Sequence, residues 1–247
     1  MQHQSHHLYK QLPNIFSHFP NGVTSIPHQL QGSSFFPAGV GLLIQEKLEF
    51  LPKFPIGGVM VLGQDWGTVK DFDTFKLKDA ENLKNRTWSN MLELFRRAEL
   101  DTRNCFFTNF FIGLRTGKSS VGRFPGASDI HYVKKCVTFF LNQVEIQKPR
   151  LILVLGAHIP KYLSTASSYL KEWQFFQNYK KLDKEGNAII HCDDFNSIKH
   201  SCVLLSLVHP CYRQLNARHR NWEGLNGDAA ELAMLRSAMA SSGILSR

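Results

Sequence analysis

Short apolar runs recur along the chain, and each stops at a glycine or a polar residue. Uninterrupted runs of this length, rich in Val, Ile, Leu and Phe, are typical of strands buried on both faces of a parallel sheet. The pattern therefore predicts core strands over 58–62, 104–112, 151–155 and 202–208, with a further short strand over 188–190.

Between these runs the apolar residues return at helical spacing. One face is formed by Trp88, Met91, Leu92, Phe95 and Ala98, with Thr87 or Ser89 as the expected cap. A second helix is expected to open at Ser128 and Asp129, and its predicted inward face is Ile130, Val133, Val137, Phe140, Leu141 and Val144. Another begins at Pro160, and an amphipathic helix closes the chain over 222–235. Alternating strands and helices predict an α/β fold, a three-layer α/β/α sandwich around a mostly parallel sheet.

The N-terminal 34 residues differ in composition from the rest of the chain. Residues 1–34 are rich in His, Gln, Pro, Asn and Ser and have few apolar positions, so we expect a polar N-terminal arm that is partly disordered. Residues 35–247 are expected to form a single domain. Within it, the charged segment 68–85 is expected to be a surface loop over the mouth of a site.

Composition narrows the class of protein. The 247 residues are 43% hydrophobic, which suits one globular domain, and no apolar run has the length of a membrane span. The N-terminus lacks the apolar core of a signal peptide, so a cytoplasmic protein is expected, or a nuclear one in a eukaryote. A formal net charge of +9 favours a polyanionic partner such as nucleic acid, although a basic enzyme of another kind fits the charge equally well. A monomer is the default expectation.

The cysteines and histidines predict neither disulfides nor a metal. Five widely spaced cysteines, with no C-x-x-C pair, do not form a disulfide framework, a zinc ribbon or an iron–sulfur motif. His191, Cys192, His200 and Cys202 are possible zinc ligands, but their spacing is irregular and two of them lie in strand-like runs. We therefore expect no metal site.

Three polar residues lie at or just beyond the ends of the predicted strands: Asp65, Asn109 and His209. In a parallel sheet such ends converge on one cleft. An amide can pair with the edge of a pyrimidine, and an imidazole can donate to an oxygen that gains charge as the base leaves. A carboxylate can stabilise an oxocarbenium-like sugar and hold water. Each residue taken alone also fits a plain turn or a buried hydrogen bond.

Two short motifs carry a family resemblance. Gly63-Gln64-Asp65 resembles the first motif of uracil-DNA glycosylases, G-Q-D-P-Y, and His209-Pro210-Cys211-Tyr212-Arg213 resembles their last motif, which begins H-P-S. The order Arg213, Asn216, Trp222 is similar to the single-strand-selective monofunctional uracil glycosylase branch. The resemblance extends from about residue 35 to the C-terminus.

The resemblance implies a role for each matching residue. Asp65 would position water or stabilise the cationic sugar, and the backbone N–H of Gln64 would contact a base carbonyl. Asn109 would bind the pyrimidine edge, and His209 would stabilise the departing base. Arg213 lies on the loop that family members insert into the duplex, although a phosphate contact is an equal alternative. The implied reaction needs no cofactor and leaves an abasic site without nicking the strand.

The motifs also depart from the family pattern. Trp66-Gly67 replaces the Pro-Tyr whose Tyr excludes the methyl group of thymine, which favours uracil or a 5-substituted uracil in DNA as the substrate. Trp66, Phe72 and Phe75 are the candidates for the aromatic that stacks on the base, and Trp66 is alternatively a packed wall. Together with Cys211 in the Ser position, these changes motivate a non-enzymatic nucleic-acid-binding module as the alternative function. A hydrolase of free nucleosides is a further alternative.

Basic residues follow the predicted strands at two places. The loop 113–119 resembles a phosphate-binding Walker A loop but has three residues between its glycines where that motif needs four, so a nucleotide triphosphatase is not expected. Arg115 and Lys118 of this loop are expected to hold DNA phosphates. Arg218 and Arg220 form a second cationic group beside Arg213, and DNA contact is favoured over a solvated loop.

Overall fold

A central five-stranded sheet organises the protein in a computed structural model that describes residues 4–45, 52–75 and 80–244. Its strands are β2 (Val59–Gly63), β3 (Cys105–Asn109), β5 (Leu151–Leu155), β6 (Ile189–Cys192) and β7 (Cys202–Leu207), in the order β3-β2-β5-β7-β6. The first four in this order run parallel, and β6 pairs antiparallel with β7 at the edge. The mostly parallel sheet confirms the predicted fold class.

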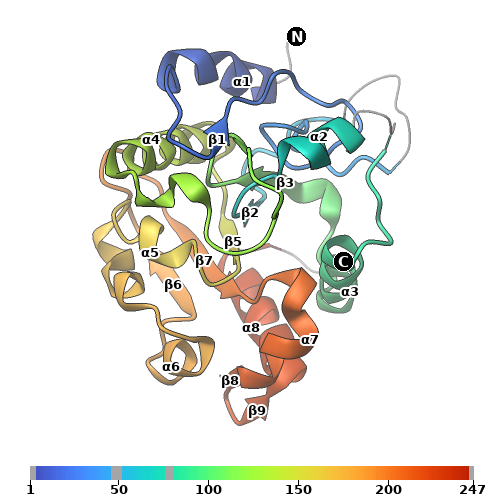
Figure 1. Cartoon of the computed structure of the whole chain (residues 1–247). Helices are drawn as coiled ribbons and strands as arrows, with labels where there is room; N and C mark the ends of the chain where they lie inside the picture. Colours follow the sequence, from blue (N-terminus) through green and yellow to red (C-terminus); the bar gives the residue numbers. More distant parts are fainter. Residues whose placement is uncertain (1–3, 46–51, 76–79, 245–247) are drawn as a thin grey trace.

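Helices cover both faces of the sheet (Figure 1). On one side α4 (Ile130–Gln147) packs against α5 (Pro160–Leu163), and on the other α3 (Arg86–Ala98) packs against α8 (Gly227–Ser241). Smaller elements join them: α1 (Gln4–Ile15), β1 (Val23–Thr24), α2 (Val69–Phe75), β4 (Leu114–Arg115), α6 (Tyr179–Lys184), α7 (Arg213–Asn216), β8 (Asn221–Trp222) and β9 (Leu225–Asn226). The result is the expected three-layer sandwich.

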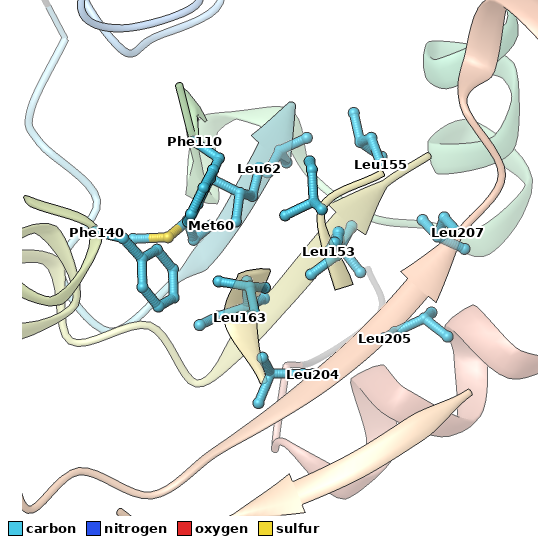
Figure 2. Packing of buried hydrophobic residues seen from close by; sticks show 14 of the residues in the cluster. Met60, Leu62, Phe110, Phe140, Leu153, Leu155, Leu163, Leu204, Leu205 and Leu207 are labelled. Carbon is cyan, nitrogen blue, oxygen red and sulfur yellow. The ribbon is translucent and has the colours of Figure 1, made fainter. Parts of the chain in front are cut away.

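The core lies between the strands and these helices. Figure 2 shows Met60 and Leu62 of β2 in the same cluster as Leu153 of β5 and Leu205 of β7, all of them fully buried. Every position of β2, β3, β5 and β7 is buried, and their sequences are apolar except at Thr108, Asn109 and Ser206.

The helix caps correct one prediction and bear out another. The side chain of Asn85, rather than Thr87 or Ser89, accepts a hydrogen bond from Trp88 N and begins α3. Asp129 caps α4 as expected, by accepting from the backbone N–H groups of the first turn. Ile130 is 64% exposed, because the buried face of α4 is rotated toward Tyr132, Cys136 and Phe139.

The N-terminal segment is part of the domain, which corrects the expectation of a polar arm. Helix α1 packs against α4 and buries Leu8 and Leu12, and the Phe16 ring lies edge-on to Tyr132 and Phe139. A few apolar residues at helical spacing are enough to attach a polar segment to an existing core.

The segment 68–85 is not a single loop. Residues 69–75 form α2, and Phe72 is buried beneath it. Residues 76–79 lie outside the described part of the chain. Among the described residues, no helix combines the length and the apolar character that crossing a membrane requires.

Candidate active site

The structure brings the three strand-end residues to one cavity. Asp65 follows β2, Asn109 ends β3 and His209 follows β7, and all three side chains line a cavity of about 490 Å³. This volume is in the range of small-molecule binding pockets. The parallel order of the strands explains the convergence, because their carboxyl ends meet at the same edge of the sheet.

Backbone hydrogen bonds fix the turn that carries Asp65. The carbonyl of Gln64 accepts from Phe111 N at 2.9 Å, and the carbonyl of Gly67 accepts from Arg115 N at 2.9 Å. The turn is thus attached on both sides of Asp65 to the segment that follows β3, which gives its side chain a defined direction.

The Asp65 carboxylate is paired with a buried arginine. Nε of Arg115 donates to Oδ1 at 2.9 Å and Nη2 donates to Oδ2 at 2.8 Å, and each side chain is only 4% exposed. Nε2 of Gln64 adds a third bond to Oδ2 at 3.0 Å. The expectation that Arg115 holds DNA phosphates is therefore corrected, because its guanidinium faces inward to Asp65.

Asn109 presents an unpaired amide. Its side chain is 2% exposed, and among the residues that the structure describes Nδ2 has no hydrogen-bond partner. A buried amide without a partner is unfavourable unless a ligand satisfies it. Gly63 makes room for this group, since a methyl group at residue 63 would lie 2.5 Å from Asn109 Oδ1.

A backbone hydrogen bond fixes the tautomer of the neutral His209 imidazole. Nδ1 accepts a hydrogen bond from Cys211 N at 3.2 Å, so the proton of the neutral ring is on Nε2. Burial lowers the pKa of His209, His158 lowers it further, and the nearby Asp65 opposes them. The neutral ring can thus donate from Nε2 to an acceptor in the cavity.

The lowered pKa of His209 predicts a pH-dependent stability. The unfolded chain protonates this residue near 6.5 while the native state resists protonation, so the contribution of His209 to the free energy of unfolding falls as the pH drops below 6.5. Denaturant unfolding at about pH 7.5 and about pH 5.5 should show a larger loss for the wild type than for His209→Gln. Equal losses in the two proteins would contradict this account.

The aromatic candidates occupy different positions. Trp66 and Phe75 line the cavity, whereas Phe72 is 1% exposed, does not line it and packs edge-on against Trp66, which corrects its assignment as a base-stacking residue. The indole Nε1 of Trp66 donates to Ser33 Oγ at 3.1 Å, so Trp66 is held as a wall of the cavity. Phe35, which the sequence analysis did not single out, also lines the cavity.

Two further arginines expected at the DNA are buried counter-ions. Arg213 pairs with Glu231 and Asp228, and Arg220 pairs with Asp183 at 3.0 Å and with Glu231 at 3.3 Å. Their guanidinium groups support the end of β7, because Glu231 also accepts from Val208 N at 2.7 Å. These contacts correct the DNA-binding assignment of both residues.

Two of the expected DNA-binding residues are exposed. Lys118 and Arg218 remain at the surface, and the loop that carries Arg213 exposes Tyr212 and Leu215 instead. His158 also lines the cavity, three residues beyond Leu155, the last residue of β5. Asp65 and His209 each lie two residues beyond the end of a strand, so extending the same rule by one position would have selected His158.

Within the described ranges, His, Cys, Asp and Glu side chains do not gather in groups of three or more that could hold a metal ion. The cavity presents a carboxylate with a guanidinium partner, an amide whose Nδ2 has no partner among the described residues, and a neutral imidazole.

A comparison with known protein families finds a match. Residues 59–229, from the start of β2 into α8, match the family model described as the uracil DNA glycosylase superfamily. No curated protein matches the chain. The matched range covers more than half of the chain and includes Asp65, Asn109, Arg115 and His209.

Proposed function

Because the chain belongs to the uracil DNA glycosylase superfamily, whose members act on DNA, we propose that it hydrolyses the N-glycosidic bond of uracil or a 5-substituted uracil in DNA. The products would be the free base and an abasic site in an intact strand. The observation that carries the proposal is the unpaired Asn109 amide, buried in the same cavity as Asp65 and His209.

The three groups suit the successive needs of this reaction. The Asn109 amide donates from Nδ2 to a carbonyl of the base and accepts from its imide N–H through Oδ1. His209 donates from Nε2 to the base oxygen that gains negative charge as the glycosidic bond breaks. Asp65 stabilises the positive charge that develops on the sugar and orients the water whose oxygen bonds to the anomeric carbon.

The wall beside Asp65 supports a substrate with a group at the 5-position. Trp66 is held by Ser33 and packs edge-on against Phe75, so its indole is fixed in the wall. Gly67 has no side chain to project into the cavity. Because residue 67 has no side chain to exclude an added group, discrimination against a uracil with a 5-substituent is weak.

A DNA partner is supported by charge outside the cavity. Lys118 and Arg218 are exposed, and the chain carries a formal net charge of +9. Phosphate contacts from such side chains give affinity without sequence preference. Tyr212 lines the cavity and Leu215 is 60% exposed on the same loop, so we place apolar side chains from this loop against the bases.

One observation favours the alternative of a DNA-binding module without activity. Arg115 compensates the charge of Asp65, and a compensated carboxylate stabilises a cationic sugar less than a free one. Under this alternative, DNA binds to the chain and no base is released.

A panel of matched oligonucleotides tests the proposal. Single- and double-stranded DNA would carry uracil, 5-hydroxymethyluracil, thymine opposite guanine, or hypoxanthine, and alkali would cleave the strand at abasic sites. We expect cleavage with uracil and 5-hydroxymethyluracil and none with hypoxanthine. Hypoxanthine offers the Asn109 amide the same pair of a carbonyl and an N–H as uracil does, but its bicyclic purine is larger than the pyrimidine ring. Cleavage of the hypoxanthine strand alone would contradict the proposed substrate class.

A further inference from the structure

Arg115 uses every donor of its guanidinium group. Besides its two bonds to Asp65, Nη2 donates to the Gly122 carbonyl at 2.9 Å, and Nη1 donates to the carbonyls of Val121 at 3.1 Å and Arg123 at 3.4 Å. The guanidinium carbon also lies 5.5 Å from the centre of the Phe124 ring. This side chain therefore holds Asp65 and one wall of the cavity at the same time.

The bonds to Asp65 restrict which carboxylate oxygen is available for chemistry. A carboxylate offers roughly four acceptor positions, two on each oxygen. Oδ2 receives Arg115 Nη2 and Gln64 Nε2, and Oδ1 receives Arg115 Nε. Among the contacts of the described residues, the remaining acceptor position is on Oδ1.

From this count, and resting on the proposed function, we propose that Arg115 is a positioning residue for base release. It fixes the rotation of the Asp65 carboxylate so that the remaining acceptor position of Oδ1 holds the attacking water. Arg115 does not touch the substrate in this assignment. It acts through Asp65, whose bidentate partner sets the plane of both oxygens.

The expected size of the effect follows from geometry. A carboxylate held by one donor can rotate and offer either oxygen, and a displacement of about 1 Å in a reacting group lowers a rate by roughly 10²-fold. Lysine keeps the positive charge but is a point donor, and a single ammonium group cannot reproduce the planar pair of bonds to the two oxygens. Arg115→Lys thus separates the charge of this residue from its geometry.

The chain supplies a matched control. Arg103 also binds an aspartate in a two-oxygen arrangement, with Nε at 3.2 Å from Asp101 Oδ1 and Nη2 at 3.0 Å from Asp101 Oδ2, but its side chain is 67% exposed. Arg103→Lys makes the same chemical change outside the cavity. Exposed pairs of this kind contribute little to stability, so this variant should resemble the wild type.

The test is single-turnover base release from uracil-containing DNA at saturating protein, together with the DNA dissociation constant and Tm of each variant. We expect Arg115→Lys to release base about 10²-fold more slowly while its DNA affinity stays within about 3-fold, and Arg103→Lys to match the wild type. In Arg115→Ala, added methylguanidinium should restore part of the rate and methylammonium should not, a difference that a folding defect would not produce.

Each other outcome overturns a specific claim. Base release by Arg115→Lys at the wild-type rate would refute the positioning role and leave the proposed function intact. A slow rate explained entirely by weaker DNA binding, with no rescue by methylguanidinium, would assign Arg115 to the structure of the 121–123 wall alone. No base release by the wild type would refute the proposed function, and this inference with it.

Discussion

Asp65→Asn is expected to slow base release by about 10²–10⁴-fold while changing DNA affinity little. Asn keeps the size of the side chain but removes the negative charge that stabilises the sugar cation and activates water. The carboxylate is 4% exposed inside the cavity, so it contributes nothing to the surface that meets DNA phosphates. Single-turnover kinetics and DNA binding, measured on the same preparation, check both parts of the expectation.

The Asp65→Asn experiment needs a control for stability. Removing the carboxylate leaves the buried Arg115 charge without its counter-ion, which costs roughly 3–5 kcal/mol for a buried pair. The double variant Asp65→Asn/Arg115→Gln removes the unpaired charge as well and should recover part of this stability without recovering activity. A single variant that retained activity within about 3-fold of the wild type would contradict the role of Asp65.

Asn109→Ala is the second change with a large expected effect, because activity and stability should respond differently. Base release should fall by about 10²-fold or more, since a site built to hydrogen-bond its substrate loses that recognition. The free energy of unfolding should change by no more than about 1 kcal/mol, because the substitution removes a buried unpaired Nδ2 as well as packing. Base-release kinetics and denaturant unfolding measure the two quantities.

Asn142→Ala is the matched control for Asn109→Ala. Asn142 lies on α4 outside the cavity, and its Nδ2 donates to Gln11 Oε1 at 3.2 Å. It should lose some stability and no activity, the opposite of Asn109→Ala. If Asn109→Ala were strongly destabilised and fully active when folded, the amide would be structural and the base-recognition role would be wrong.

The sheet, and the meeting of polar residues at the carboxyl ends of its strands, could both be predicted from the apolar runs. Strands buried on both faces are uniformly apolar, so each is visible as a run, and the residue that ends a run is at the carboxyl edge of the sheet. Asp65 and His209 follow directly from this rule, and both line the cavity. Asn109 lies inside the apolar run predicted over 104–112, and it reaches the same edge because β3 ends at Asn109. The superfamily match supports the same reading of the fold.

The direction of the arginine side chains was not predictable in the same way. Arg213 and Arg220 share Glu231 as a partner, and Arg220 also reaches Asp183, residues that the fold alone brings together. A positive charge in a sequence indicates neither burial nor a counter-ion. The same limit applies to Arg115, whose carboxylate partner is 50 residues away along the chain.

Phe35 and the N-terminal segment were missed for a related reason. The Phe35 ring lies 5.4 Å from Trp88 and 5.5 Å from Phe107, so its position depends on two other elements. Helix α1 buries Leu8 and Leu12 against a helix more than a hundred residues away. The local polarity of a segment does not show which neighbours cover its few apolar side chains.

The most direct test of the account is the simultaneous measurement of free base and of the DNA strand after incubation with uracil-containing DNA. We expect equal amounts of free uracil and of an intact strand with one abasic site from the wild type, and at least about 10²-fold slower formation of both products from Asp65→Asn. DNA that binds to the wild type and yields no free base from uracil or any 5-substituted uracil would contradict the account and favour a binding module.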